Sequence, residues 1–172
     1  QSPQSQFIMS YLSEIKNSDQ AWSDTSAQLV AVGLFEDQKL TPLGQTIDKG
    51  LGGVISQVID QGALKGKPGE SHSFFDDKRQ VMVMGLGKRD DFDAEAIRKA
   101  GGSIAKAALG DKVSSVAVEC LCPGSDKSDC QALAEGLVLG SYRFTEHKAK
   151  EEDEVDLEEA SVLGGDETCL QK

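Results

Sequence analysis

Short apolar runs alternate along the chain with longer stretches in which apolar residues recur at helical spacing. The short runs lie between turn-forming residues, which indicates strands buried in a sheet. Residues 71–75 and 80–84 flank a polar turn of hairpin length, so these two strands are expected to pair. The pattern predicts five strands, at residues 29–34, 71–75, 80–84, 113–121 and 157–163.

Helical spacing marks four further segments. A short helix is predicted near the start of the chain, from the apolar residues Phe7, Ile8, Tyr11, Leu12 and Ile15. The next segment has Thr41 as its N-cap and Pro42 in the first turn, and Gly52-Gly53 in its middle leaves open one weakened helix or two. The last two are predicted at residues 94–109, capped by Asp91 or Asp93, and at 129–144.

Two glycines in the last predicted helix, Gly136 and Gly140, lie one turn apart on one side. They would let that side approach a neighbouring element closely, and we expect this neighbour to be the sheet. Strands that alternate with helices indicate an α/β sandwich with a mixed sheet.

The acidic residues are concentrated at the end of the chain. The 172 residues carry a net charge of −11, but residues 146–172 alone hold ten acidic and three basic residues. Residues 1–145 are nearly balanced. This split predicts a globular body followed by an acidic segment, and it argues against sequence-independent nucleic-acid binding, which relies on Lys and Arg. The sequence also has no apolar run of membrane-spanning length and no secretory signal pattern.

The cysteines do not predict a metal site or a disulfide framework. Cys120 and Cys122 lie two positions apart in a predicted strand, so their side chains should point to opposite faces. A zinc site needs four ligands, and only His72 and His147 could complete one. We therefore expect Cys120, Cys122, Cys130 and Cys169 to be reduced thiols.

The most suggestive motif is the turn Gly85-Leu86-Gly87, which joins a strand to a helix start. Helix N-termini bind phosphate, but the dinucleotide fingerprint needs a third glycine where this chain has Asp90. Asp90, Asp91 and Asp93 would repel a phosphate group and would stabilise the helix start instead. Glycines that permit a tight turn are the preferred interpretation.

No other motif predicts a reaction. His72 lies between two serines without a third group to orient it, and His147 lies at a predicted helix end, so both are interpreted as structural. The acidic run at residues 151–154 lacks the glycine-turned spacing of a calcium loop. From the residues alone, the chain is an α/β domain without a recognisable active site.

Three stretches of the chain are similar to one known family. They are VGLFEDQKLTPLG at residues 32–44; KGKPGE at 65–70, followed by VMVMGLGKR at 81–89 and AIRKAGG at 96–102; and ALAEGLVLGSYRF at 132–144. Their order and spacing resemble the N-terminal domain of the leucyl aminopeptidases, cytosolic dizinc exopeptidases, over residues 29–165. Residues 1–28 have no counterpart in that resemblance.

The resemblance implies a macro-domain-like fold, a three-layer sandwich with a mixed sheet between helices. It also implies that the zinc ligands and the catalytic lysine and arginine lie in a larger C-terminal domain, around an Asn-Thr-Asp-Ala-Glu-Gly-Arg signature that residues 1–172 do not contain. No residue here matches a catalytic, cofactor-binding or metal-binding position. Two zinc or manganese ions are expected in that further domain.

The expected organisation is an N-terminal extension at residues 1–28, a macro-like domain at 29–145, and a segment at 146–172 that holds an acidic linker and a candidate last strand and leads to the catalytic domain. The resemblance implies a cytoplasmic protein whose partners are its own catalytic domain and further copies of the chain in a hexamer. No membrane partner is expected, and the acidic balance of the chain argues against a nucleic-acid partner. Two alternatives stay open. One is a stand-alone macro-like module that binds ADP-ribose or a nucleotide, and the other is an interaction domain whose acidic tail engages a basic partner.

Overall fold

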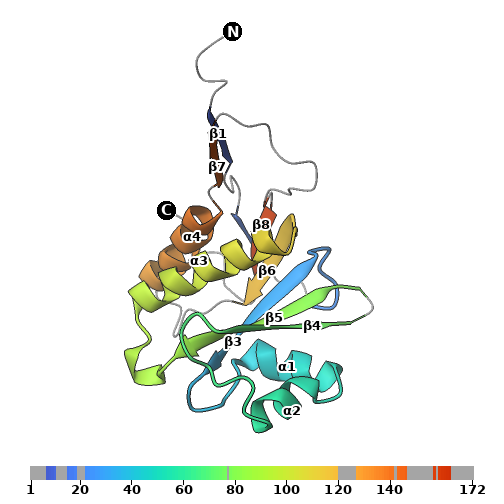
Figure 1. The fold of residues 1–172 in the computed structure, drawn as a ribbon. Coiled ribbons are helices and arrows are strands. Elements are labelled where there is room, and N and C mark those ends of the chain that lie inside the picture. Colours follow the sequence, from blue (N-terminus) through green and yellow to red (C-terminus); the bar gives the residue numbers. More distant parts are fainter. Residues whose placement is uncertain are drawn as a thin grey trace.

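The protein folds around one mixed sheet with helices on both faces (Figure 1). A computed structural model of the chain describes residues 7–10, 15–18, 22–76, 78–119, 127–141, 143–146, 157 and 159–163. The sheet has six strands in the order β2-β8-β6-β3-β5-β4. All neighbouring strands run parallel except β4, which is antiparallel to β5 at one edge. The predicted three-layer α/β sandwich is confirmed.

The sheet strands are β2 (Ile15–Ser18), β3 (Leu29–Phe35), β4 (Ser71–Phe75), β5 (Gln80–Gly87), β6 (Ser115–Glu119) and β8 (Glu159–Leu163). The helices are α1 (Pro42–Gly50), α2 (Val54–Asp60), α3 (Ala94–Gly110) and α4 (Lys127–Gly140), and residues Arg89–Asp91 form a 3-10 turn. A separate two-stranded ribbon, β1 (Phe7–Ser10) with β7 (Arg143–Glu146), projects beyond the sheet in Figure 1.

Alternate residues of the central strands supply two separate cores. Leu29 and Ala31 of β3 pack with α3 and α4 on one face, whereas Val30 and Val32 pack with α1 and α2 on the other. Every residue of β3 is buried. A strand covered on both faces has no polar positions, which is why its sequence reads as one continuous apolar run.

The glycine pair at residues 52–53 divides the predicted second helix into α1 and α2. Gly52 and Gly53 both have positive φ, 78° and 83°, a conformation that residues with a side chain rarely adopt. Thr41 and Pro42 occupy the predicted positions at the start of α1. The two-helix alternative is therefore correct.

The predicted contact of Gly136 and Gly140 with the sheet is wrong, because these glycines face α3. A Cβ on Gly136 would lie 2.0 Å from the carbonyl oxygen of Arg98, and one on Gly140 would lie 2.4 Å from that of Gly102. On α3, a Cβ on Gly101 would lie 2.8 Å from the carbonyl oxygen of Leu133. The two helices cross backbone against backbone, and a methyl group would force them apart.

The predicted N-terminal helix is also wrong, because residues 7–10 and 15–18 form strands. Each strand pairs with a segment from the far end of the chain: β1 with β7, and β2 with β8. Long-range pairing here overrides the local apolar spacing. Phe144 was predicted on the last helix, but α4 ends at Gly140. Phe144 lies instead in β7, where it pairs with β1.

Several sequence predictions lie outside the described residues. They concern the thiols of Cys120, Cys122 and Cys169, His147, the loop at 123–126 and the acidic run at 151–154. The side chain of Cys130 also lies outside the description. Within the described part of the chain, no helix is both long and apolar enough to traverse a bilayer.

Candidate functional site

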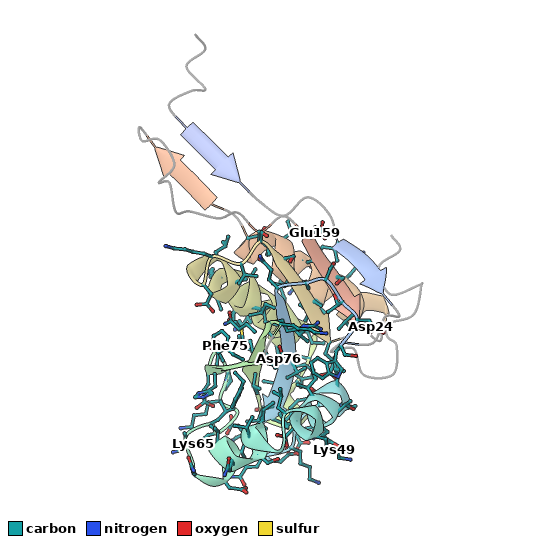
Figure 2. The ribbon with its side chains drawn as sticks, turned by 90° about the vertical axis from the view of Figure 1, so that its right-hand side faces the viewer. Asp24, Lys49, Lys65, Phe75, Asp76 and Glu159 are labelled. Atoms are coloured by element: carbon teal, nitrogen blue, oxygen red, sulfur yellow. The ribbon has the colours of Figure 1, made fainter. Side chains whose placement is uncertain are left out.

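The carboxyl ends of the parallel strands are the natural place for a site in this topology. Ligands of open α/β sheets bind where adjacent strands lead to helices on opposite faces. Here β3 leads to α1 on one face, while its neighbour β6 precedes α4 on the other. Figure 2 shows Lys65, beside the carboxyl ends of the strands, far from Glu159, which lies at the start of β8 and toward the opposite end of the six-stranded sheet.

A buried carboxyl group fills this crevice. Glu119, the last residue of β6, is only 6% exposed and reaches the N-terminus of α1. Its Oε2 accepts a hydrogen bond from the backbone N–H of Leu43 at 3.0 Å, and its Oε1 contacts the hydroxyl of Thr41. An N-terminal helix turn attracts anions through its free N–H groups. In this protein a side chain of the same domain already occupies that position.

The pKa of Glu119 lies above the usual range for a glutamate. Burial raises it, and hydrogen bonds from the Thr41 hydroxyl and from the N–H groups of Leu43 and Gly44 offset only part of that effect. The Thr41 hydroxyl also lies 3.2 Å from both the N and the O of Gly33. Strand β3, strand β6 and helix α1 therefore meet at one hydrogen-bonded cluster.

A second carboxylate organises the loop beside β5. One oxygen of Glu70 accepts hydrogen bonds from three successive N–H groups, those of Lys65, Gly66 and Lys67, at 2.9, 2.6 and 3.2 Å. Burial acts to raise the pKa of Glu70, but these donors outweigh it and leave the pKa below its usual value. Consecutive N–H groups that converge in this way form an anion-binding nest, and Glu70 fills it.

The Gly85-Leu86-Gly87 turn lies directly against this loop. A Cβ on Gly85 would lie 2.0 Å from the carbonyl oxygen of Lys67, and Gly87 has a φ of 83°. The N–H of Gly87 also donates to the carbonyl oxygen of Gly66 at 2.8 Å. These glycines permit close backbone contact, as the sequence interpretation held.

The cavity beside this turn is acidic. It measures about 400 Å³ and lies between the turn and the start of α3, where Asp93 accepts a hydrogen bond from Ala96 N–H at 2.9 Å. Four carboxylates (Glu36, Asp91, Asp93 and Glu95) and two lysines (Lys88 and Lys99) line it. An excess of negative charge opposes phosphate binding here, and the N-terminus of α3 already has its own cap.

The N-terminus of α2 is likewise capped by a carboxyl group of the domain itself. Asp48, 8% exposed on α1, accepts hydrogen bonds from the N–H groups of Ile55 at 2.9 Å and Ser56 at 3.2 Å, and it contacts the Ser56 hydroxyl. The three helices α1, α2 and α3 thus begin on a carboxyl group from the domain itself.

Among the described residues, none forms a nucleophile–base pair with His72. It lies on the edge strand β4 with its ring 4.8 Å from that of Phe74, while its neighbours Ser71 and Ser73 are exposed. Among the residues that the structure describes, no three His, Cys, Asp or Glu side chains are grouped so that they could hold a metal ion. The described residues therefore do not fit a dizinc centre.

Sequence reasoning missed Glu119, Asp48 and Glu70 as organising residues. The partners of Glu119 lie 76 and 78 positions away, so no local pattern could reveal them. Glu70 ends the resembling stretch KGKPGE, in which Lys65, Gly66 and Lys67 supply the three N–H groups.

Phe35 and Arg89 bring two of the resembling stretches into contact. Arg89, from VMVMGLGKR, lies over the ring of Phe35, from VGLFEDQKLTPLG, at 4.0 Å from its centroid. Its Nε also donates to Asp37 at 3.0 Å. The two stretches thus form one contact at the carboxyl ends of β3 and β5.

Sequence comparisons with a family profile and with known proteins identify the same family. The profile described as "Cytosol aminopeptidase family, N-terminal domain" matches residues 31–151. A probable cytosol aminopeptidase from Cyanothece sp. is 31% identical over 165 residues, which cover 90% of this chain and 34% of that protein. The chain therefore spans about a third of the length of this relative.

Solved structures agree with the sequence comparison. A tomato leucine aminopeptidase mutant superposes with a TM-score of 0.72 and 25% identity, covering 90% of this chain and 33% of that one. The macrodomain of Thermus aquaticus DarG superposes with a TM-score of 0.61 at 10% identity, covering 87% of this chain and 97% of that one, which shows a shared fold alone. The chain belongs to the cytosol aminopeptidase family, as its N-terminal domain.

Proposed function

We propose that this domain is a non-catalytic part of a leucyl aminopeptidase and serves the assembly of the full-length enzyme into a hexamer. The observation that carries the proposal is that the domain's own side chains occupy the positions where an anionic ligand could bind. The crevice at β3 and β6, the nest at residues 65–70 and the start of α3 each hold a carboxyl group of the domain itself: Glu119, Glu70 and Asp93. A domain whose anion sites are filled internally is suited to a structural role.

The reaction of the full-length enzyme would be the metal-assisted hydrolysis of an N-terminal residue from a peptide, in the cytoplasm. A metal ion there would polarise the carbonyl group and activate a water molecule. The two zinc or manganese ions belong to the catalytic domain in this proposal, since no metal-binding group occurs among the described residues. No step of the reaction is assigned to this domain.

The first test is catalytic. The purified 172-residue chain, incubated with leucine p-nitroanilide and either Zn²⁺ or Mn²⁺, is expected to release no product, while a full-length cytosol aminopeptidase serves as the positive control. Metal-dependent turnover by the chain alone would contradict the proposal.

The second test is assembly. Sedimentation of the full-length polypeptide and of a form without residues 1–172 should show fewer subunits per particle for the shortened form. Equal subunit numbers in the two forms would contradict the assembly role. Zinc content, measured on both forms, should stay the same per subunit because the metal centre lies elsewhere.

A second candidate is a stand-alone macro-like module that binds ADP-ribose or a nucleotide, and its cue is the Gly85-Leu86-Gly87 turn at the end of β5. The acidic cavity and the internal carboxyl groups oppose it, since a diphosphate would meet negative charge at each position. Calorimetry with millimolar ADP-ribose is therefore expected to give no binding heat. A saturable heat would instead establish the second candidate.

A further inference from the structure

Strand β4 forms one margin of the sheet, and within the described residues it pairs with β5 alone (Figure 1). The N–H of Gly85 donates to the carbonyl oxygen of Glu70 at 2.6 Å, and the N–H of Asp76 donates to that of Arg79 at 3.1 Å. Both pairs continue the register of β4 and β5, and hydrogen-bonded pairs alternate along an antiparallel ladder. The even-numbered residues of β4 therefore bond to β5, while the odd-numbered residues direct their N–H and C=O groups outward.

The outward-facing residues are Ser71, Ser73 and Phe75, and all three are exposed. Phe75 is 72% exposed, an unusual position for a large apolar side chain. Edge strands of soluble proteins are commonly protected by a lysine, a proline or a bulge. The five residues of β4 include no lysine, acidic residue or proline, and their register with β5 is unbroken. An open edge of this kind is typical of a strand that pairs with another chain.

Two copies of β4 can pair antiparallel about a two-fold axis. In any register centred on one residue, outward-facing residues of one copy meet outward-facing residues of the other. The register that overlaps all five residues is centred on Ser73, but it places Glu70 opposite Asp76 of the second copy. Like charges directly opposite each other destabilise a sheet. A register centred on Phe74 avoids this contact.

The register centred on Phe74 also brings complementary side chains together. His72 would lie opposite Asp76 of the second copy, where a ring N–H can donate to the carboxylate. Oδ1 of Asp76 accepts two backbone N–H groups of the following turn, both at 2.7 Å, which holds the carboxylate in place and leaves Oδ2 for a further donor. Glu70 would lie opposite Lys78 of the second copy, a pair of opposite charge.

We propose that β4 pairs with β4 of a second copy of this chain, in the antiparallel register centred on Phe74, and so joins two sheets into one. Ser73 of each copy would exchange two backbone hydrogen bonds with Phe75 of the other, and the Phe75 ring would cover Ser73. The inference rests on the assembly role proposed above, for which it names the contact surface.

The first test is the self-association of the 172-residue chain, measured by sedimentation equilibrium for Ser73→Pro and Ser73→Ala. The N–H of Ser73 points away from β5, so proline removes an outward donor without removing a bond of the β4–β5 ladder. Ser73→Ala is the matched control, since it loses the same hydroxyl, which accepts from Gln80 at 2.9 Å, but keeps the N–H.

The dissociation constant of the dimer should be at least about tenfold higher for Ser73→Pro than for Ser73→Ala, because each dimer loses two hydrogen bonds. Equal constants for the two variants would overturn the proposal. A wild-type chain that stays monomeric at about 1 mM protein would overturn it as well.

A second variant tests the same surface without changing the backbone. Phe75→Lys removes the apolar cover over Ser73 and should weaken the dimer. Leu139→Lys, at a 58% exposed position on α4, makes the same chemical change away from β4 and should leave the dimer intact. Equal weakening by both variants would contradict pairing through β4.

Hydrogen exchange on the wild type locates the contact directly. The N–H groups of Ser73 and Phe75 should exchange more slowly as protein concentration rises. Those of His72 and Phe74 bond to β5 in either state and should change little. Exchange at Ser73 and Phe75 that does not depend on concentration would refute the pairing even if Ser73→Pro did not fold.

Failure of this contact can be distinguished from failure of the assembly role. If the full-length polypeptide loses subunits when residues 1–172 are removed, while Ser73→Pro associates like Ser73→Ala, the assembly role stands and the β4 contact is wrong. An unchanged subunit number after the deletion would contradict the assembly role itself.

Discussion

The two faces of the sheet are held by different means. On the α3–α4 face the helices meet through glycines, with a backbone atom of one helix where a Cβ of the other would lie. On the α1–α2 face the short helices and the adjoining loop are fixed by the carboxyl groups of Asp48, Glu70 and Glu119, which accept backbone N–H groups.

This difference separates two kinds of stability. Backbone contact through glycine is insensitive to pH but does not tolerate added volume. Carboxyl-to-N–H contacts depend instead on the protonation state of the carboxyl group. The sequence signatures differ accordingly, since glycines recur on α3 and α4 while the carboxylates of the other face are dispersed along the chain.

The largest effect is expected from Gly136→Ala. The new methyl group would lie 2.0 Å from the carbonyl oxygen of Arg98, so α4 must shift and the free energy of unfolding should fall by about 3 kcal/mol. Gly110→Ala is the matched control at an exposed position with no atom within 4 Å, and it should change stability by less than about 0.5 kcal/mol. Urea unfolding measures both, and equal effects would remove the special role of the α3–α4 contact.

A smaller effect is expected from Asp48→Ala on the other face. The variant leaves the N–H groups of Ile55 and Ser56 without their acceptor, which should cost about 2 kcal/mol. Asp60→Ala, at an exposed position at the end of α2, is the control and should be nearly neutral. A loss for Asp48→Ala no larger than that of the control would show that α2 does not depend on this carboxylate.

The smallest effect is expected from Glu70→Gln, and it should depend on pH. The folded-state pKa of Glu70 is lowered, so its carboxylate contributes stability above the unfolded pKa, and this contribution is lost as pH falls through the folded pKa. The free energy of unfolding of the wild type should exceed that of the variant by about 1 kcal/mol at neutral pH, and this difference should become smaller in acid. Thermal unfolding at both pH values measures it. A difference that widens in acid would contradict the nest.

Local patterns predicted the parts of the fold that depend on local contacts. The run at residues 29–34 and the hairpin at 71–84 were recognisable because burial on both faces and a short turn each leave a mark in sequence. The break at Gly52-Gly53 was visible as well, although only the backbone angles decided between one helix and two.

The parts of the fold and of the site that the sequence did not predict depend on contacts between positions far apart in the chain. The spacing of Gly136 and Gly140 indicates that another element packs closely against α4, but it does not identify that element as α3. Residues 7–15 carry helical spacing, yet their strand partners lie more than 130 positions later. Glu119 is one acidic residue among 29 acidic residues, and only the fold brings it to Thr41.

The position of β8 has a consequence for the way the chain becomes a domain. This strand is the last of the sheet in sequence, yet it lies between β6 and β2. During synthesis one edge of β6 therefore stays unpaired until residue 163 has been made. Strand β2 is the first strand of this sheet to be made, but it can pair only after β8 is in place. Such late, non-local pairing slows folding. The first strand of this sheet to be made therefore pairs only after the last one, β8, is available.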